Sequence, residues 1–415
     1  MRDVVRIVHA VDGYPPVPGG MEQAVEALAV AQVRAGHDVT VVSLAGPGLP
    51  AVEERDGVRV ERVATRLGAV VDRFAADPTH RFHPTVPDPG VVRHLAATVR
   101  RTGADVLHAH GWVLASATRV ELPPRTLLAH TLHDYGLRCA TRTLVPRRRL
   151  DVVCPGPRAD RCLPCAAGFY GVAKGTALVA GLAAGARARR RVGLFLPISD
   201  AVAATLPPLA PGQHVAVVPS AVADDALDAA AAAPRPGWLP DGDVVLFAGQ
   251  LGEHKGVGLL ARAHAAMRAP VPLVLVGAAR ADTPVTPGSA DRPVVRVGPR
   301  PHAQVLGAMR AAAVVAVPSR WAEPLGLVAV EAMAAGTPVV ASDLGGLADV
   351  VTAGTGLLVA PGDPVALAAA LDGLLADPDR RRALGAAGPA RARDFAASRV
   401  ARRVLAAYDA ARPTG

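Results

Sequence analysis

Short apolar runs alternate with helical stretches along the first half of the chain, and Gly and Pro residues separate them. Residues 4–10 (VVRIVHA) and 38–44 (DVTVVSL) predict strands, and residues 21–35 between them predict a helix. The other strand-like runs of this half are at 105–110, 126–133 and 194–199. Because these strands are apolar throughout and alternate with helices, we expect a parallel sheet with helices on both faces.

The same pattern starts again in the second half. The strands predicted there are at 244–250, 272–278, 293–298, 314–319, 338–343 and 357–361, and the helices are at 256–267, 302–312 and 325–335. The Ala-, Pro- and Gly-rich stretch 224–241 is interpreted as a linker. The sequence therefore predicts an α/β fold of two Rossmann-like, doubly wound domains facing a cleft, at 1–222 and 223–394. Ligands are expected at the carboxyl ends of the strands.

Composition and charge narrow the choice of partners. The chain of 415 residues is 51% hydrophobic, which is enough for the cores of two domains. Its net charge is +9, and Lys174 and Lys255 are the only lysines among many arginines. A basic surface favours an anionic substrate or an anionic membrane. Aromatic residues make up only 3% of the chain and are not interleaved with the basic ones, so we expect no nucleic-acid partner.

The chain shows no sign of a membrane-spanning or secretory segment. No run approaches twenty uncharged apolar residues, and Met1-Arg2-Asp3 leads directly into the first strand. We therefore expect a cytoplasmic protein. Arginines at 187–191 follow the apolar run 175–186, so peripheral docking on a membrane stays open as an alternative. A buried helix with a solvated basic end is the favoured interpretation.

Two glutamates eight positions apart carry the strongest chemical signal of the second half. Glu323 follows the strand at 314–319, and Glu331 lies inside the next predicted helix, in EPLGLVAVE. Amides at 325–327, at the start of that helix, can bind a phosphate, and the carboxylates can accept hydrogen bonds from sugar hydroxyls. Because the residues between the glutamates are apolar, a solvated helix face explains the pair poorly.

Two loops at strand ends suit phosphate groups. Lys255 follows the strand at 244–250, where a compact ammonium group suits a diphosphate and a plain surface lysine is the alternative. Gly19 and Gly20 lie in the first strand-to-helix loop, where small residues let the backbone approach a phosphate at the helix N-terminus. An ordinary turn explains the glycine pair equally well. The loop lacks G-x-G-x-x-G, so a dinucleotide site is not supported.

Together these segments resemble the family-4 retaining glycosyltransferases, which have the GT-B fold. The resemblance extends over nearly the whole chain and includes DVLHAH, HTLHDYG, FAGQLGEHKGV, PSRWAEPLGLVAVEAMAAGTPVV and SDLGGLADVV. It implies transfer of a hexosyl group, with retention, from a UDP- or GDP-sugar to a hydroxyl acceptor. That acceptor could be a saccharide, a lipid-linked saccharide or a small metabolite. The resemblance also implies that segment 395–415 forms a helix that returns to the N-terminal domain.

The resemblance assigns roles to particular residues. It implies that Glu331 binds the donor ribose, that Glu323 binds the transferring sugar and that Lys255 lies on the diphosphate. It places His110 near the sugar and the acceptor hydroxyl, so we predict His110, Glu323 and Lys255 as catalytic. The other residues expected to bind substrate are Gly19, Gly20, His133, Gln250, Gly326, Leu327 and Glu331.

The expected chemistry needs no metal. Cleavage of the bond between the anomeric carbon and the diphosphate places negative charge on the leaving group, which Lys255 and a helix N-terminus would stabilise. The resemblance implies front-face attack with the leaving phosphate as base. Asp241-Gly242-Asp243 has the form of a D-x-D metal motif, but it precedes a strand, so we interpret it as a solvated turn.

Two alternatives to an active transferase stay open. The family usually has Arg at the position of Gln250, so an inactive sugar-nucleotide-binding subunit is one alternative. A sugar-nucleotide epimerase of the same architecture is the other, although the spacing of Glu323 and Glu331 argues against it.

All four cysteines lie in one insert of the first domain, at 139–165. Cys139, Cys154, Cys162 and Cys165 have the spacing C-x14-C-x7-C-x2-C among turn-forming residues. Stable disulfides are not expected in a cytoplasmic protein. We therefore weigh a structural zinc site, which such turns would suit, against reduced thiols that only pack.

Overall fold

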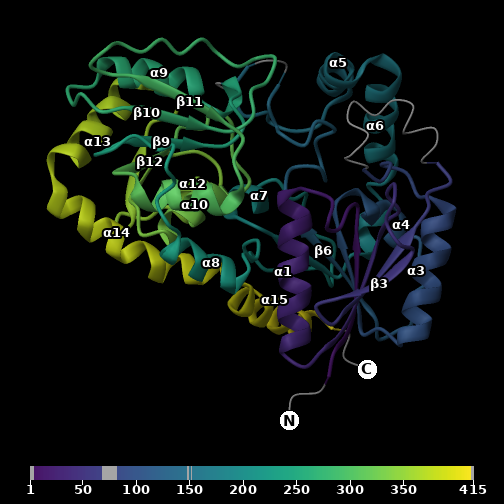
Figure 1. Ribbon diagram of the computed structural model, residues 1–415. Helices are drawn as coiled ribbons and strands as arrows, with labels where there is room; N and C mark the ends of the chain where they lie inside the picture. The colour runs from purple at the N-terminus through teal and green to yellow at the C-terminus, as the bar shows by residue number, and fades with distance from the viewer. Residues whose placement is uncertain (1–3, 68–81, 147–148, 151, 413–415) are drawn as a thin grey trace. The chain divides into compact units, whose positions relative to one another are not determined.

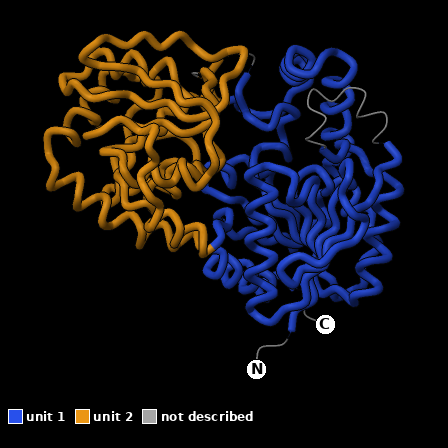
Figure 2. The backbone as a smooth tube through the Cα atoms, viewed as in Figure 1, with its two compact units in different colours: residues 1–147, 154–223, 397–415 blue, residues 148–153, 224–396 orange. Residues whose placement is uncertain are grey.

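The structure is a computed structural model that describes residues 4–67, 82–146, 149–150 and 152–412. The chain divides into two compact units (Figure 2). Unit 1 comprises residues 1–147, 154–223 and 397–415, and unit 2 comprises residues 148–153 and 224–396. The chain therefore passes from unit 1 into unit 2 after residue 223 and re-enters unit 1 at residue 397.

Unit 1 is built on a sheet flanked by helices (Figure 1). Within the described residues this sheet has eight strands, in the order β3-β4-β2-β1-β5-β6-β7-β8. The strands are β1 (Arg6–Val11), β2 (Asp38–Leu44), β3 (Val52–Arg55), β4 (Val58–Val63), β5 (Val106–His110), β6 (Leu127–Leu132), β7 (Leu194–Pro197) and β8 (His214–Val215). Neighbouring strands are parallel except β3 and β4. Asp56 and Gly57 join that hairpin, and both have the positive φ that a tight two-residue turn requires.

Helices pack on this sheet through their apolar sides. They are α1 (Gly20–Arg34), α3 (Pro89–Thr102), α4 (Leu114–Ala117), α5 (Ala159–Tyr170), α6 (Val172–Ala184), α7 (Asp200–Ala203) and α15 (Ala397–Ala411), with 3-10 turns η1 (Gly111–Val113) and η2 (Ala188–Arg191). Asp88 caps α3 by accepting hydrogen bonds from the amides of Gly90 and Val91. The last helix, α15, packs against α1, and its buried Val404 and Tyr408 join the core around β1.

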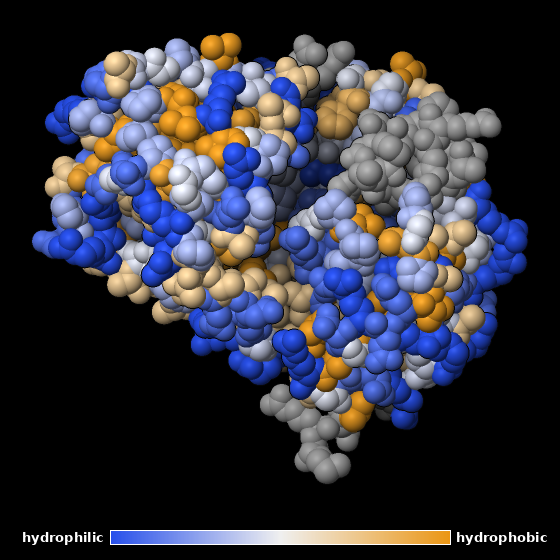
Figure 3. Space-filling view, viewed as in Figure 1, coloured by the Kyte–Doolittle hydropathy of each residue, from blue (hydrophilic) through white to orange (hydrophobic). Residues whose placement is uncertain are grey.

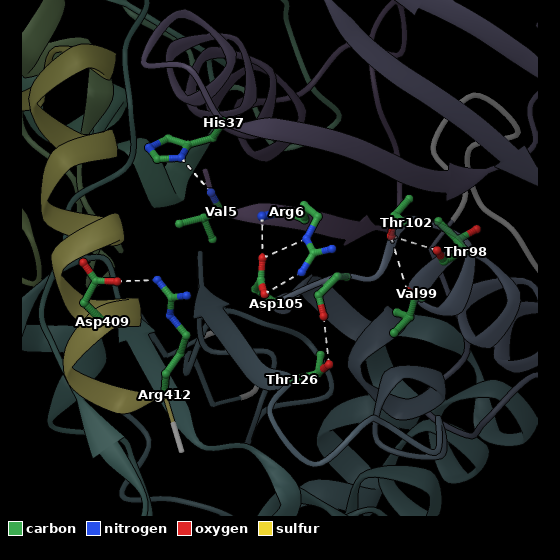
Figure 4. A network of polar contacts seen from close by, with 11 residues as sticks. Val5, Arg6, His37, Thr98, Val99, Thr102, Asp105, Thr126, Asp409 and Arg412 are labelled. Carbon is green, nitrogen blue, oxygen red and sulfur yellow. Dashed lines mark hydrogen bonds and ion pairs between the residues drawn. The ribbon is translucent and has the colours of Figure 1, made fainter. Parts of the chain in front are cut away.

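A network of polar contacts connects the strands at the amino end of this sheet (Figure 4). Arg6 of β1 donates to both carboxylate oxygens of Asp105, each at 3.2 Å, and its backbone amide donates to Asp105 Oδ2 at 2.9 Å. Thr126 Oγ1 donates to the carbonyl of Ala104 at 2.8 Å. These residues lie where β1, β5 and β6 begin, so this end of the sheet is held by structural contacts. The predicted chemistry lies at the opposite, carboxyl end.

Unit 2 is built on a parallel sheet with six strands among the described residues, in the order β11-β10-β9-β12-β13-β14. The strands are β9 (Val245–Ala248), β10 (Leu273–Val276), β11 (Val294–Gly298), β12 (Val314–Val317), β13 (Val339–Ser342) and β14 (Gly356–Val359). The helices and 3-10 turns are α8 (Asp224–Ala232), η3 (Glu253–Lys255), α9 (Val257–Ala266), α10 (His302–Ala311), α11 (Leu327–Ala334), α12 (Leu347–Val350), α13 (Pro364–Ala376), α14 (Pro378–Ala392) and η4 (Arg393–Phe395). The larger helices form two packed groups, α9 with α13 and α8 with α10, α11 and α14. The prediction of two Rossmann-like α/β domains is confirmed.

Two sequence-based predictions in unit 2 need correction. The stretch 224–241 was expected to be a linker, but its first nine residues form α8, which buries Leu227 and Ala230. Alanine is the best helix former, and the Pro and Gly residues of the stretch come only after α8. The helix expected from residue 325 begins at Leu327, because Gly326 has a φ of 98° and cannot continue a right-handed helix.

The surface hydropathy and the contacts of the basic segment 187–191 bear on the alternative of peripheral docking on a membrane. Hydrophilic residues predominate on the visible outer face of each unit, with apolar residues between them (Figure 3). No helix within the described ranges is both long and apolar enough to cross a membrane. In the basic segment, Arg189 donates to the carbonyl of Leu182 and Arg191 donates to the carbonyls of Thr118 and Val120. These two guanidinium groups are therefore engaged by the protein itself.

Candidate functional site

The two predicted catalytic residues of unit 2 form an ion pair. Lys255 ends η3, after β9, and Glu323 lies in the loop between β12 and α11. Lys255 Nζ donates to Glu323 Oε1 at 2.6 Å, and Ser319 Oγ donates to the same oxygen at 2.6 Å. The Lys255 ammonium also lies 5.5 Å from the ring centroid of Trp321. The structure therefore brings together two residues that are 68 positions apart in the sequence.

Electrostatics keep Glu323 ionised although it is almost completely buried. Burial by itself would raise its pKa, but the charge of Lys255 and hydrogen bonds from Lys255 and Ser319 outweigh that effect and lower it. The Glu323 side chain is 9% exposed and that of Lys255 is 26% exposed. A buried carboxylate beside a partly exposed ammonium leaves the ammonium as the group that can meet an anion.

Glycines hold the backbone around Glu323 in close contact. The amide of Gly346 donates to the carbonyl of Glu323 at 2.6 Å. A Cβ at Gly345 would lie 2.5 Å from that same carbonyl oxygen, and a Cβ at Gly326 would lie 2.4 Å from Leu347 Cδ2. The SDLGGL segment thus packs directly on the loop that carries Glu323. Gly326 and Leu327 form the cap and the first residue of α11, and backbone amides at a helix N-terminus can bind a phosphate.

Glu331 lies in α11, and its partner is a histidine that the sequence analysis did not single out. His302 Nε2 lies 2.9 Å from Glu331 Oε1. The hydrogen bond to Glu331 raises the pKa of His302, although partial burial opposes the rise. The Glu331 side chain is 25% exposed and the His302 side chain is 59% exposed, so both can be reached from solvent.

A second cation reaches the position where the family usually has Arg. Arg280, after β10, donates from Nη1 to Gln250 Oε1 at 3.0 Å. Gln250 follows β9, the strand next to β10, so the two residues lie at the same edge of the sheet. Arg280 was missed by sequence reasoning. The signal that could have found it is its position, just beyond the carboxyl end of a predicted strand.

The glycine pair of unit 1 is crowded by a carboxylate. Gly19 caps α1 and Gly20 begins it. Glu22, in the first turn of α1, is 5% exposed, and a Cβ at Gly19 would lie 2.0 Å from Glu22 Oε2. The need for glycine at position 19 is thus explained by Glu22. Binding of a diphosphate by Gly19 and Gly20 stays a prediction.

His110 and His133 belong to a hydrogen-bonded chain of four side chains in unit 1. Gln32 Oε1 lies 2.7 Å from His9 Nε2, and His9 Nδ1 lies 2.9 Å from His110 Nε2. His110 Nδ1 lies 2.9 Å from His133 Nε2. Gln32, His9 and His110 are fully buried, whereas His133 is half-buried. His110 ends β5 as predicted, but both its ring nitrogens are engaged by other histidines, whereas His133 lines a cavity.

The imidazoles of this chain are neutral near pH 7. Burial lowers the pKa of His9 to about 4 and that of His133 to about 3. Burial also holds the pKa of His110 well below its usual value, and the neighbouring histidines add to that effect. Each ring therefore carries a single N–H.

The histidines do not fit a metal ion. His9, His108 and His110 are the only described residues whose metal-ligating atoms gather in threes within 4.8 Å. His108 hydrogen-bonds Tyr408 and Thr131 through its two nitrogens. The ring nitrogens of His9 and His110 are used in the hydrogen-bonded chain from Gln32 to His133. A metal would have to replace these hydrogen bonds.

A cavity of about 90 Å³ in unit 1 lies against His133. Small and apolar residues of α4 and α6 line much of it, and Thr131, Arg119 and Arg142 add polar groups. Arg142 Nε donates to Asp134 Oδ2 at 2.7 Å, and its guanidinium lies over the ring of Phe82. The cavity can take a small molecule with a hydroxyl near His133.

The four cysteines are neighbours but are not gathered around one point. All are reduced and partly exposed, and Cys162 and Cys165 lie one turn apart on α5. Burial raises the pKa of the Cys162 thiol, and the other three thiols add to the rise. Sulfur atoms around one zinc ion lie within about 4 Å of one another. Among the described residues, no three of the cysteine sulfur atoms lie within 4.8 Å of one another. The four sulfur atoms would have to move closer together to bind one zinc ion. Structural zinc therefore stays a prediction.

Comparison with known proteins gives the class of this chain. The family described as Glycosyltransferase Family 4 matches residues 18–225, and the family described as Glycosyl transferases group 1 matches residues 242–377. A D-inositol 3-phosphate glycosyltransferase of Kineococcus radiotolerans is 31% identical over 94% of this chain and 90% of that protein. One from Catenulispora acidiphila is 39% identical over 43% of this chain and 46% of that protein. The chain belongs to glycosyltransferase family 4.

Solved structures share the fold. Sucrose-phosphate synthase from Thermosynechococcus elongatus matches with a TM-score of 0.66 at 22% identity, over 98% of each chain. HepE of Anabaena, solved in complex with UDP and glucose, matches with a TM-score of 0.65 at 18% identity, over 98% of this chain and all of that one. These are GT-B glycosyltransferases, so the predicted fold class is confirmed.

Proposed function

We propose that the protein is a retaining glycosyltransferase that moves a hexosyl group from a UDP- or GDP-sugar to a hydroxyl acceptor. The observation that carries the proposal is the ion pair of Lys255 and Glu323 beside the N-terminus of α11, with Glu331 further along that helix. An ammonium group and unpaired helix amides attract a diphosphate, and Glu331 is exposed enough to accept hydrogen bonds from a ribose.

The leaving group is the part of the donor that unit 2 suits best. Negative charge develops on the diphosphate as the sugar departs, and fixed cations stabilise that charge more than they stabilise the bound donor. Lys255 supplies one cation. Arg280 supplies another in place of the arginine that Gln250 replaces.

The proposed reaction does not use the D-x-D-like sequence. Asp243 precedes β9, and its carboxylate accepts a hydrogen bond from Arg381 at 2.8 Å. Because this pair neutralises Asp243, the sequence 241–243 is poorly suited to hold a catalytic cation. We therefore propose a metal-independent transfer, with the leaving phosphate as base and retention at the anomeric carbon.

The acceptor is proposed to be a small hydroxyl compound. Two relatives that align over 94% of this chain are named D-inositol 3-phosphate glycosyltransferases, which favours a polyol that carries a phosphate. Arg119, which lines the cavity beside His133, suits such an anion. A saccharide or a lipid-linked saccharide is the next acceptor to test.

The location is proposed to be cytoplasmic. Four free cysteines support this, because an oxidising compartment favours pairing of neighbouring thiols. Contact with a membrane through 187–191 has less support, because Arg189 and Arg191 are engaged by backbone carbonyls.

A transfer assay separates this proposal from its alternatives. The protein is incubated with UDP- and GDP-hexoses and inositol phosphate, with and without EDTA, and the product is examined by NMR. We expect a glycoside with the anomeric configuration of the donor, formed equally well in EDTA. An inverted product would contradict retention, and loss of activity in EDTA would contradict metal independence. Nucleotide binding without turnover on any acceptor would favour the inactive subunit, and an epimerised donor sugar would favour the epimerase.

A further inference from the structure

The chain Gln32–His9–His110–His133 has a direction, because only one of its ends fixes where the protons lie. Gln32 Oε1 can only accept a hydrogen bond, so His9 donates from Nε2 and keeps a lone pair on Nδ1. A neutral imidazole has one N–H, so each further ring follows from the one before it.

The order continues ring by ring to the cavity. His110 donates from Nε2 to His9 Nδ1 and therefore accepts at its own Nδ1. His133 donates from Nε2 to that nitrogen. This leaves Nδ1 of His133 as a lone-pair nitrogen that the chain does not use, on a residue that lines the cavity.

The proton order depends on the orientation of the Gln32 amide. Its oxygen faces His9, and its Nε2 is buried without a hydrogen-bond partner among the residues that the structure describes. A reversed amide would turn the NH2 group toward His9 and reverse every N–H in the chain.

We propose that Gln32, His9 and His110 are positioning residues that hold His133 in the Nε2–H tautomer, so that His133 Nδ1 accepts a hydrogen bond from the acceptor hydroxyl. The effect on an acceptor rests on the function proposed above, whereas the proton order does not. A tautomer fixed by a partner behind the ring is a common way to set what a histidine can accept or donate. No ring has to change its charge for this role.

Several features of the site suit such a device. The three inner side chains are fully buried, so water does not compete for their hydrogen bonds. His9 of β1 pairs in register with His108 of β5, and this strand pairing fixes the position of the His9 backbone. Simple packing of the core would require none of these polar contacts, because apolar residues of similar size could fill the same space.

The proton order is tested directly by NMR. The protein is labelled with 15N-histidine, and long-range proton–nitrogen correlations identify which nitrogen of each ring carries the proton at pH 7. Single His→Gln variants assign the signals of His9, His110 and His133. We expect all three rings to be neutral with the proton on Nε2. A proton on Nδ1 of His110 or His133 would overturn the proposal whatever reaction the protein catalyses.

Two substitutions at Gln32 test the consequence for transfer. Gln32→Glu keeps an oxygen that accepts from His9, whereas Gln32→Met fills the space without one. We expect Gln32→Met to mix the tautomers and to lower kcat by roughly tenfold with the donor KM unchanged, less than the hundredfold or more that an acid–base group itself contributes. Gln32→Glu should keep both the order and most of the activity.

If Gln32 had a purely structural role, Gln32→Glu would be more harmful than Gln32→Met. Burial of a carboxylate at position 32 would then be the more harmful change, since a buried charge costs more than an apolar replacement. Thr98→Val is the matched control, because Thr98 is equally buried but bonds Glu61, away from the chain. It should reduce stability without a change in kcat. Loss of kcat in Gln32→Glu but not in Gln32→Met, at equal folding, would overturn the proposal. If no acceptor is glycosylated by the wild type, the proposed function fails and the NMR result still decides the proton order.

Discussion

Lys255 Nζ lies 2.6 Å from Glu323 Oε1, and this pair joins the loop after β9 to the loop before α11. Lys255 holds Glu323 as a carboxylate, and Glu323 holds the ammonium at the end of the sheet where ligands of such folds bind. The pair therefore sets both the charge and the position of the cation that would meet the diphosphate.

Removal of the Lys255 ammonium should affect both transfer and stability. We expect Lys255→Ala to lower kcat by about two to three orders of magnitude, the cost of losing one donor to a developing anion. The free energy of unfolding should also fall, because Glu323 is left as an unpaired, nearly buried carboxylate. Steady-state kinetics and urea unfolding measure the two effects. Lys174→Ala, which removes the only other lysine, is the control and should leave kcat unchanged. Full activity of Lys255→Ala would contradict its role.

Arg280 should substitute for the arginine that Gln250 replaces. We expect Arg280→Ala to weaken binding of a nucleoside diphosphate about tenfold, as for loss of one charge-assisted hydrogen bond. The double variant Gln250→Arg/Arg280→Ala should bind as tightly as the wild type, because the cation is moved rather than lost. Calorimetry with UDP and GDP measures this. Arg292→Ala removes a guanidinium bonded to the carbonyl of Ala265 and should have no effect. Failure of the double variant to recover binding would show that Arg280 does not act as the missing cation.

Much of this arrangement could be predicted from strand ends alone. Lys255 and Glu323 each follow a run that the pattern identifies as a strand, and Gln250 ends one. Parallel strands end at one edge of a sheet. The contact of Gln250 with Arg280 could not be predicted, because it depends on how the loop after β10 folds back. The length of α8 was missed because alanine-rich sequence suits both a linker and a helix until its packing is known.

The hydrogen bonds between the histidines of unit 1 could be predicted only in part from the sequence. His110 was identified from DVLHAH as a separate residue. His9 lies near the end of β1, two positions before Val11, which pairs with His110 of β5. The neighbouring strand β6 leads to His133. Histidines at the ends of three predicted strands were thus a usable signal. Gln32 was not, because the face of α1 that it occupies depends on packing.

The start of α11 should be sensitive to an added methyl group. Gly326→Ala would place a Cβ 2.4 Å from Leu347 Cδ2 at a φ of 98°, whereas Gly336→Ala has a φ of 80° but its nearest contact is at 3.9 Å. Both variants carry the cost of a left-handed non-glycine residue, about 1–3 kcal/mol. We expect only Gly326→Ala to weaken nucleotide binding in addition. Equal nucleotide affinities in the two variants would contradict a role for this helix start.

Acid should destabilise unit 1 before most carboxylates titrate. The native pKa of His83, His9 and His130 is about 4 because of burial, whereas an unfolded histidine titrates near 6.5. Between these values the unfolded chain binds the proton and the native state does not. The free energy of unfolding therefore falls as pH drops from 6.5 toward 4, by about 1.4 kcal/mol per pH unit for each such histidine.

Urea unfolding at pH 7, 6 and 5 measures this dependence. His130→Gln should reduce the slope. A stability that is flat over this range would contradict neutral, buried histidines.

Zinc at the cysteine insert can be decided by metal analysis. If Cys139, Cys154, Cys162 and Cys165 close around zinc, the purified protein should contain one equivalent, and Cys162→Ser should lose it with a lower melting temperature. A protein purified without chelator in which zinc is absent and the thiols react freely would favour packing thiols.

The proposed function depends most on a donor site in unit 2, and calorimetry of sugar-nucleotide binding tests that site most directly. The panel consists of UDP, GDP, ADP, TDP and their hexose conjugates without added metal, titrated into the wild type and into Lys255→Ala and Glu331→Ala. We predict that one nucleotide binds the wild type and that both variants, with folding intact, bind it at least about tenfold more weakly. Binding that is unchanged in both variants, or no binding of any nucleotide at millimolar concentration, would contradict the assignment.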